Sequence, residues 1–120
     1  MKLAIIGSRS IGDFPLEEYL PCGIEEIVSG GAKGIDRLAA EYAKEHGIAL
    51  VEFFPNYVRY GKGAPLKRNE QIAEYAEEAI AFWDGYSRGT KQSIDQFKKL
   101  GKHVRIVMIS SQKEKKESPS

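Results

Sequence analysis

Five short apolar runs constrain the fold of this chain more than any other feature of its sequence. They cover residues 2–6, 26–28, 50–54, 79–83 and 103–109, and each of the first four is followed within two residues by glycine or proline. Continuous apolar runs of this length, bounded by such residues, are typical of strands that are buried on both faces of a parallel sheet. We therefore predict five strands over these ranges.

Apolar residues at helical spacing lie between these runs. Stripes within residues 35–43, 72–79 and 94–100 predict three helices, and residues 14–20 predict a short first helix. Strands that alternate with helices indicate βαβ units with right-handed crossovers. Residues 55–65 are expected to form a long loop. Residues 110–120 have no apolar side chain and are expected to form a disordered polar tail. The sequence thus predicts one α/β domain over residues 1–109, with a mostly parallel five-stranded sheet.

Composition narrows the class of partner. The 120 residues suffice for one domain, and 18 Lys and Arg against 17 Asp and Glu leave a net charge of +1. This balance disfavours a protein that coats nucleic acid by bulk charge. One cysteine and two histidines exclude a disulfide framework within the chain and disfavour a metal site. The apolar runs are too short to span a bilayer. The N-terminus lacks the long apolar region of a signal peptide and leads directly into a predicted strand. We therefore expect no membrane partner and a cytoplasmic location.

Polar loops follow several predicted strands, at the edge of the sheet where open α/β domains bind ligands. Each loop combines small residues with a hydroxyl, guanidinium, ammonium or carboxylate group, close to a predicted helix. The candidate binding residues are Gly7, Ser8 and Arg9 after the first strand; Ser29, Gly30, Gly31, Ala32, Lys33, Gly34 and Asp36 after the second; Arg68 and Asn69 at a predicted helix start; and Asp84, Gly85, Ser87, Gly89 and Thr90 after the fourth.

These residue types suit an anion. The free N–H groups and the dipole of a helix N-terminus attract negative charge, and glycine lets the backbone approach a phosphate. A guanidinium fork matches phosphate oxygens. The same glycines and hydroxyls also serve ordinary turns and helix caps, so each loop alone has two interpretations. Several such loops at one edge favour a small phosphorylated ligand such as a nucleotide.

Two widespread nucleotide-binding motifs do not occur in the chain. Residues 7–12 do not form GxGxxG, and residues 30–34 lack the spacing and the Gly-Lys-Ser/Thr sequence of a P-loop. A dinucleotide-dependent dehydrogenase and a P-loop NTPase are therefore disfavoured. We expect that no cofactor is required.

The same segments, taken in order, resemble the SLOG superfamily. They are Gly7-Ser8-Arg9, residues 28–36, residues 61–69, and residues 81–85 followed by Ser87, Gly89 and Thr90. The strongest resemblance is to its YspA-like branch, long described as a domain of unknown function. The resemblance implies a Rossmann-like, three-layer α/β/α fold that binds a nucleotide or a nucleotide-derived ligand. The phosphate is then expected on residues 30–34 and 85–90, held by Arg9 and Arg68.

Two better understood relatives imply different activities. The chain resembles LOG phosphoribohydrolases, which cleave the N-glycosidic bond of a nucleoside monophosphate, in its late Gly-Thr region. Ser93 stands where their motif has its catalytic glutamate, and a hydroxyl cannot replace a carboxylate in that role. Asp84 and Asp36 are the candidate catalytic residues that remain for this alternative. Asp84 follows directly on a predicted strand, which is the best location for a catalytic carboxylate in this chain.

The DNA-processing protein DprA is similar in its Gly-Ser-Arg and Ser-Gly-x-Ala-x-Gly-Ile-Asp segments and binds single-stranded DNA. Residues 59–68 contain four basic residues and no acid, with tyrosines nearby, so nucleic acid is a second alternative. It is less favoured because no long basic track continues this segment. Relatives of this fold often dimerise through helices, and a homodimer is therefore a further expectation.

Overall fold

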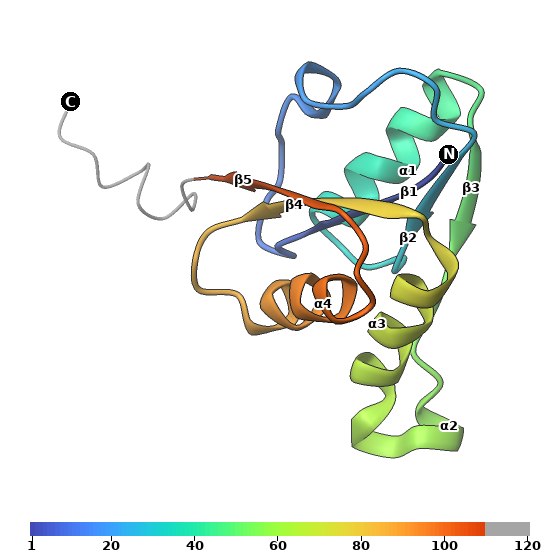
Figure 1. Cartoon of the computed structure of the whole chain (residues 1–120), viewed down its shortest axis with the longest axis vertical. Coiled ribbons are helices and arrows are strands. Elements are labelled where there is room, and N and C mark those ends of the chain that lie inside the picture. The colour runs from blue at the N-terminus through green and yellow to red at the C-terminus, as the bar shows by residue number, and fades with distance from the viewer. Residues whose placement is uncertain (110–120) are drawn as a thin grey trace, which may run out of the picture.

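Five parallel strands form one sheet in the order β3-β2-β1-β4-β5 (Figure 1). The strands are β1 (Lys2–Gly7), β2 (Glu26–Ser29), β3 (Ala49–Glu52), β4 (Glu78–Trp83) and β5 (Val104–Met108). Every pairing between neighbours is parallel, which confirms the predicted α/β class and its five-stranded sheet. This computed structural model describes residues 1–109, and the predicted tail at 110–120 lies outside the described residues.

Helices cover both faces of the sheet, so the domain has the expected three α/β/α layers (Figure 1). The helix α1 (Ile35–Glu45) and the 3-10 turn η1 (Leu16–Glu18) pack on one face, where Ile5, Ile27 and Ala39 belong to one buried cluster. The helices α3 (Ala64–Tyr75) and α4 (Arg88–Lys99) cover the other face, where Ala73 and Phe97 are buried against β1 and β2. Both faces of the central strands are therefore removed from water.

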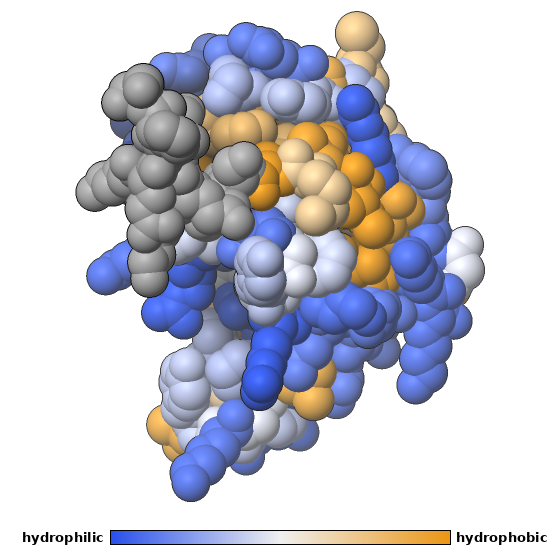
Figure 2. All heavy atoms as spheres, turned by 90° about the vertical axis from the view of Figure 1, so that its left-hand side faces the viewer, coloured by the Kyte–Doolittle hydropathy of each residue, from blue (hydrophilic) through white to orange (hydrophobic). Residues whose placement is uncertain are grey.

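The two edge strands differ from the prediction that all five strands are buried on both faces. Three residues of β3 are exposed, and in β5 the side chains of Ile106 and Met108 are exposed as well. An edge strand has a neighbour on one side only, and its outer residues receive less cover from the helices. Figure 2 shows hydrophobic residues gathered on the face at which β5 lies. The homodimer, which we expected to form through helices, stays a prediction.

The segment expected as a first helix forms only the 3-10 turn η1. The segment is too short for a longer helix, because Pro15 lies directly before the turn and Pro21 follows soon after it. Helix nucleation is costly, and so few residues cannot repay it. None of the helices in residues 1–109 combines the length and hydrophobicity of a membrane span.

The predicted loop at 55–65 is largely helical. It contains α2 (Tyr57–Tyr60), which Asn56 caps by accepting a hydrogen bond from the Arg59 N–H at 3.1 Å, and the 3-10 turn η2 (Gly61–Gly63). The helix α3 then begins at Ala64, several residues before the predicted start near Arg68. Pro65 accounts for the early start, because its fixed φ and missing N–H suit the first turn of a helix.

Trp83 lies at the end of β4 and is half-buried, whereas its place in an apolar run predicts a core residue. Its indole Nε1 donates a hydrogen bond to the Ser87 carbonyl at 3.1 Å. The side chain therefore braces the loop between β4 and α4 rather than filling the core.

Lys102 ties the C-terminus of α3 to the segment that leads into β5. Its Nζ donates to the carbonyls of Ala73 at 2.7 Å, Glu74 at 3.0 Å and Ala76 at 2.7 Å. The last carbonyls of a helix lack intrahelical partners and carry the negative end of the helix dipole. A cation with three such acceptors stabilises both the helix end and the adjoining strand.

We predict that Lys102→Met lowers the free energy of unfolding by about 1–2 kcal/mol, because the helix end loses a charged donor. Urea unfolding followed by circular dichroism measures the change. Lys98→Met, in the exposed last turn of α4, serves as the control and should change stability by less than about 0.5 kcal/mol. Equal effects of the two substitutions would contradict the assigned role of Lys102.

Candidate functional site

A pocket of about 410 Å³ opens at the carboxyl ends of β1, β2 and β4. The strand order reverses at β1, with β2 on one side and β4 on the other, and open α/β sheets bind ligands at such a point. Most of the predicted site residues line this pocket, namely Gly7, Ser8, Arg9, Gly30, Ala32, Asp36, Arg68, Asn69, Ser87, Gly89 and Thr90. Residues that are far apart in the sequence thus meet at one place, as the parallel topology predicts.

Arg68 is the most firmly positioned cation of the pocket. Its Nη1 donates to the Gly30 carbonyl at 2.7 Å and to the Phe53 carbonyl at 3.4 Å, and its Nε donates to Asn69 Oδ1 at 2.9 Å. These bonds join the second turn of α3 to the loop after β2 and to the residue after β3. Nη2 has no hydrogen bond to any residue of 1–109. Arg68 is half-buried. Its hydrogen bonds fix the guanidinium, and the N–H donors of Nη2 remain unused.

This position changes the physical basis on which Arg68 and Asn69 were predicted. They lie within α3, whose first residue is Ala64, and not at a helix start. Backbone N–H groups in a second turn bond within the helix and cannot receive an anion. Arg68 can contribute only through its side chain. The buried Asn69 serves as an acceptor that orients Arg68.

Asp36 places a carboxylate in the pocket, in the first turn of α1. Its Oδ2 accepts a hydrogen bond from the Ala32 N–H at 3.1 Å. Burial raises the pKa of Asp36 above its ordinary value of 3.8, although the bond from Ala32 and the charge of Arg68 oppose that shift. Burial lowers the pKa of Arg68, while the charge of Asp36 raises it. No ion pair within 4.0 Å joins the two groups in the described part of the chain.

The loop after β2 satisfies some of its own N–H groups. The Gly31 N–H donates to Ser29 Oγ at 3.3 Å, and the Ile35 N–H donates to the Ser8 carbonyl at 3.2 Å. Gly34 has a φ of 71°, and a Cβ at this position would overlap the Ser8 carbonyl. Glycine is needed here because only it combines this φ with so close a backbone contact. Some backbone N–H groups of the loop at residues 30–34 and of the helix start after it are therefore already bonded. Fewer of them are free to bind the predicted phosphate than the number of glycines suggests.

Hydroxyl groups form two clusters among the residues that line the pocket, one in the loop after β1 and one at the start of α4. Ser8 Oγ and Ser10 Oγ lie 2.7 Å apart after β1, and Arg9 between them is exposed at the rim. Ser87 caps α4 by accepting from the Thr90 N–H at 3.4 Å, and the Ser87 and Thr90 hydroxyls lie 3.1 Å apart. The N–H groups of the first turn of α4 have no intrahelical partner. This end of α4 therefore presents both hydroxyls and a positive dipole to the pocket.

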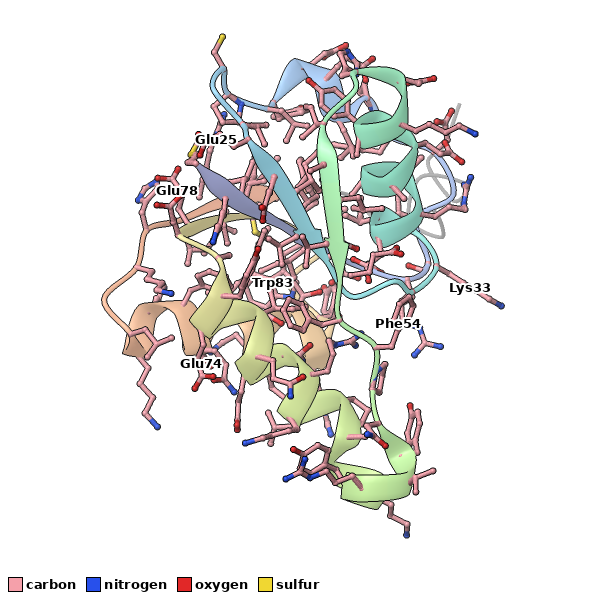
Figure 3. The ribbon with its side chains drawn as sticks, turned by 90° about the vertical axis from the view of Figure 1, so that its right-hand side faces the viewer. Glu25, Lys33, Phe54, Glu74, Glu78 and Trp83 are labelled. Atoms are coloured by element: carbon pink, nitrogen blue, oxygen red, sulfur yellow. The ribbon has the colours of Figure 1, made fainter. Side chains whose placement is uncertain are left out.

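Six of the predicted site residues do not line the pocket, namely Ser29, Gly31, Lys33, Gly34, Asp84 and Gly85. Asp84 Oδ1 accepts from the Tyr86 N–H at 2.8 Å and the Ser87 N–H at 2.9 Å, so this carboxylate shapes the turn before α4. Lys33 extends away from the sheet (Figure 3). Ser29 accepts a hydrogen bond from the Gly31 N–H, and Gly34 packs against the Ser8 carbonyl, so both residues serve the conformation of the loop. Of the two predicted catalytic carboxylates, the structure therefore brings only Asp36 to the pocket.

Five residues that line the pocket were not predicted from the sequence, namely Ile5, Ile6, Ser10, Ile72 and Ser93. Ser10 could have been found, because it lies two residues after Ser8 in the same loop. Ser93 lies one helical turn after Thr90, on the same side of α4. The isoleucines form an apolar floor that no motif marks, since apolar residues in a strand or helix suit the core equally well.

The basic segment considered for nucleic acid lies on α2, η2 and the start of α3. Arg59 and Lys67 both lie over the ring of Tyr60, at 5.3 and 5.8 Å from its centroid. Two cations on one ring leave less of that ring free for a base.

No group of three or more His, Cys, Asp or Glu residues in the described chain could hold a metal ion.

The family described as YAcAr, the YspA, cpYpsA-related SLOG family, matches residues 1–60 of this chain. No curated protein and no solved structure gives a significant match. The matched half contains the loops that carry Ser8, Arg9, Gly30 and Asp36. Arg68 and the whole of α4 lie beyond it, so their place in the pocket rests on the structure.

We predict that Asp36→Asn changes how stability depends on pH. The folded state holds the Asp36 proton more tightly than the unfolded chain does, because burial raises the pKa of this carboxyl. Ionisation therefore opposes folding, and this contribution grows as pH rises from about 4 through the raised pKa. Asparagine keeps the acceptor for the Ala32 N–H and does not ionise. Its stability relative to the unchanged protein should rise between about pH 4 and pH 7, as measured by urea unfolding. Parallel pH profiles would contradict the prediction.

Proposed function

Because the chain belongs to the YspA, cpYpsA-related SLOG family, we propose that it binds a nucleotide or a nucleotide-derived phosphorylated ligand in the pocket at the carboxyl ends of β1, β2 and β4. The proposal rests chiefly on Arg68, which Gly30, Phe53 and Asn69 hold in one orientation while Nη2 keeps its donors. A fixed guanidinium loses little entropy when it binds phosphate. The binding requires no cofactor.

The surroundings of Arg68 favour an anion of limited size. Arg9 also lines the pocket, and its charge adds to the effect of burial in lowering the pKa of Arg68. A phosphate bound near both would relieve this repulsion and would accept from the hydroxyls of Ser87 and Thr90. A pocket of about 410 Å³ lies in the range of small-molecule sites. The sugar would lie on the side of Asp36, whose carboxylate can accept from a hydroxyl.

The position of Asp36 also supports a second candidate function, a nucleotide N-glycosidase. A carboxyl whose pKa is raised by burial keeps its proton to a higher pH than an ordinary aspartic acid, which suits it to general acid and base chemistry. In this role Asp36 would protonate the leaving base or activate a water molecule. Ser93 lines the pocket where the related hydrolases have a glutamate, and Asp36 is the carboxylate among the lining residues. Any such activity therefore depends on Asp36.

We predict that nucleoside monophosphates stabilise the protein and that Arg68→Ala weakens their binding by a factor of about 10–100, which is the effect of losing a charged hydrogen bond. Thermal shift measurements across nucleotides identify a ligand, and calorimetric titration then gives its Kd. Arg105→Ala is the matched control, because it also removes a guanidinium that donates to a backbone carbonyl, that of Tyr19.

The control variant should bind as the unchanged protein does. Circular dichroism must show that Arg68→Ala is folded, since Arg68 also holds two loops together. The proposal is wrong if no phosphorylated nucleoside or sugar binds to the unchanged protein. It is also wrong if both arginine variants lose affinity equally.

For the N-glycosidase we expect release of free base from a nucleoside monophosphate, and loss of that release in Asp36→Asn by a factor of at least about 100. Chromatography of the reaction products measures the base directly. Asp84→Asn is the matched control and should keep most of the activity, because Asp84 serves the turn before α4. Absence of base release across purine and pyrimidine substrates would exclude this second candidate.

A further inference from the structure

Phe54 is a large aromatic residue that the fold leaves open to solvent. It follows β3 by two residues, and 62% of its surface is exposed. The preceding residue, Phe53, turns inward and packs edge-on against Tyr75, with ring centroids 5.6 Å apart. Phe54 belongs to neither buried cluster of the core. Its exposed ring therefore contributes little to the hydrophobic stability of the domain.

The ring of Phe54 is nevertheless held in place. It lies against the backbone of Gly31, where a Cβ would overlap the ring. Gly31 has a φ of 69°, which side chains other than glycine rarely adopt. In Figure 3 Phe54 lies beside the loop that carries Lys33, at the edge where the strands end. One side of the ring is thus supported by backbone, while much of the rest faces solvent.

This contact lies directly beside the anchors of Arg68. Arg68 donates to the carbonyls of Gly30 and Phe53, and the next residues along the chain, Gly31 and Phe54, touch each other. The pocket and the exposed ring therefore share one piece of backbone. Tyr57, in the helix that follows, is another exposed aromatic residue, with 61% of its surface open to solvent.

We propose that Phe54 is a stacking platform for the base of the nucleotide ligand, outside the phosphate pocket and across the loop at Gly31. The inference rests on the proposed function and names the part of the ligand that the pocket does not hold. A flat ring that is fixed on one side stacks a base without the entropy cost of ordering a loose side chain. Stacking tolerates any base and favours the larger purines modestly. The ligand class is therefore a nucleotide with its base attached, rather than a sugar phosphate.

The experiment compares two ligands on three proteins by calorimetric titration. The ligands are adenosine monophosphate and ribose 5-phosphate, in which an anomeric hydroxyl takes the place of the base. The proteins are the unchanged chain, Phe54→Leu and Tyr86→Leu. Tyr86 is the matched control, because it is also an exposed aromatic residue, with 77% of its surface open, in the loop on the β4 side. Leucine keeps much of the apolar bulk and removes the aromatic face.

We expect the unchanged protein to bind adenosine monophosphate about ten times more tightly than ribose 5-phosphate, as one stacked base provides. Phe54→Leu should remove most of that difference and leave the affinity for ribose 5-phosphate unchanged. Phe54→Tyr should restore the difference, and Tyr86→Leu should keep it. Quenching of an etheno-adenine nucleotide on binding, lost in Phe54→Leu, gives an independent spectroscopic signature of stacking.

Three results would overturn the inference. Equal affinity of the unchanged protein for both ligands would show that the base makes no contact, while the proposed phosphate site stands. Loss of the difference in Tyr86→Leu alone would place the base on the β4 side. Absence of binding by both ligands would overturn this inference, because the inference requires that a purine monophosphate binds. The proposed function fails only if no other phosphorylated nucleoside or sugar binds either.

Discussion

The parallel direction of all five strands is the constraint on which the rest of this structure depends. After each strand the chain must cross back to the edge at which the previous strand began. Every loop that leaves the carboxyl end of a strand therefore lies at the same edge of the sheet. The order reverses at β1, and the loops after β1, β2 and β4 diverge around a space that no strand fills. The helices α1 and α4 begin beside that space. A concave, polar site follows from topology before any particular side chain is considered.

Side chains, more than backbone N–H groups, make this space specific. Arg68 reaches it from within α3 and bonds to carbonyls that follow two different strands. The loop after β2 bonds partly to itself, through Ser29, Asp36 and Ser8. In this domain the positive charge is brought from one layer of helices to the edge of the sheet. The loop after β2 bonds partly to itself and holds Arg68 in place through the Gly30 carbonyl.

The sequence predicted the central part of the fold well, because the buried strands are continuous apolar runs and the topology follows from their alternation with helices. It predicted Ser8 and Gly30 in the site for the same reason, since they follow such strands directly. It predicted Asp36 because this residue lies where the loop after β2 enters a helix. It could not predict the exposure of β3 and β5, which depends on strand order. Nor could it predict the turns that direct Asp84 and Lys33 away from the pocket. A side chain's direction depends on local hydrogen bonds, such as those that the Asp84 carboxylate accepts from Tyr86 and Ser87.

Asp36 and Arg68 both line the pocket without forming an ion pair, and this has a consequence for the number of protons taken up on binding. A phosphate that enters the pocket adds negative charge beside a carboxyl whose pKa burial already raises. Its arrival would raise that pKa further, so a fraction of the molecules would take up a proton as they bind. The observed heat of binding would then depend on the ionisation enthalpy of the buffer.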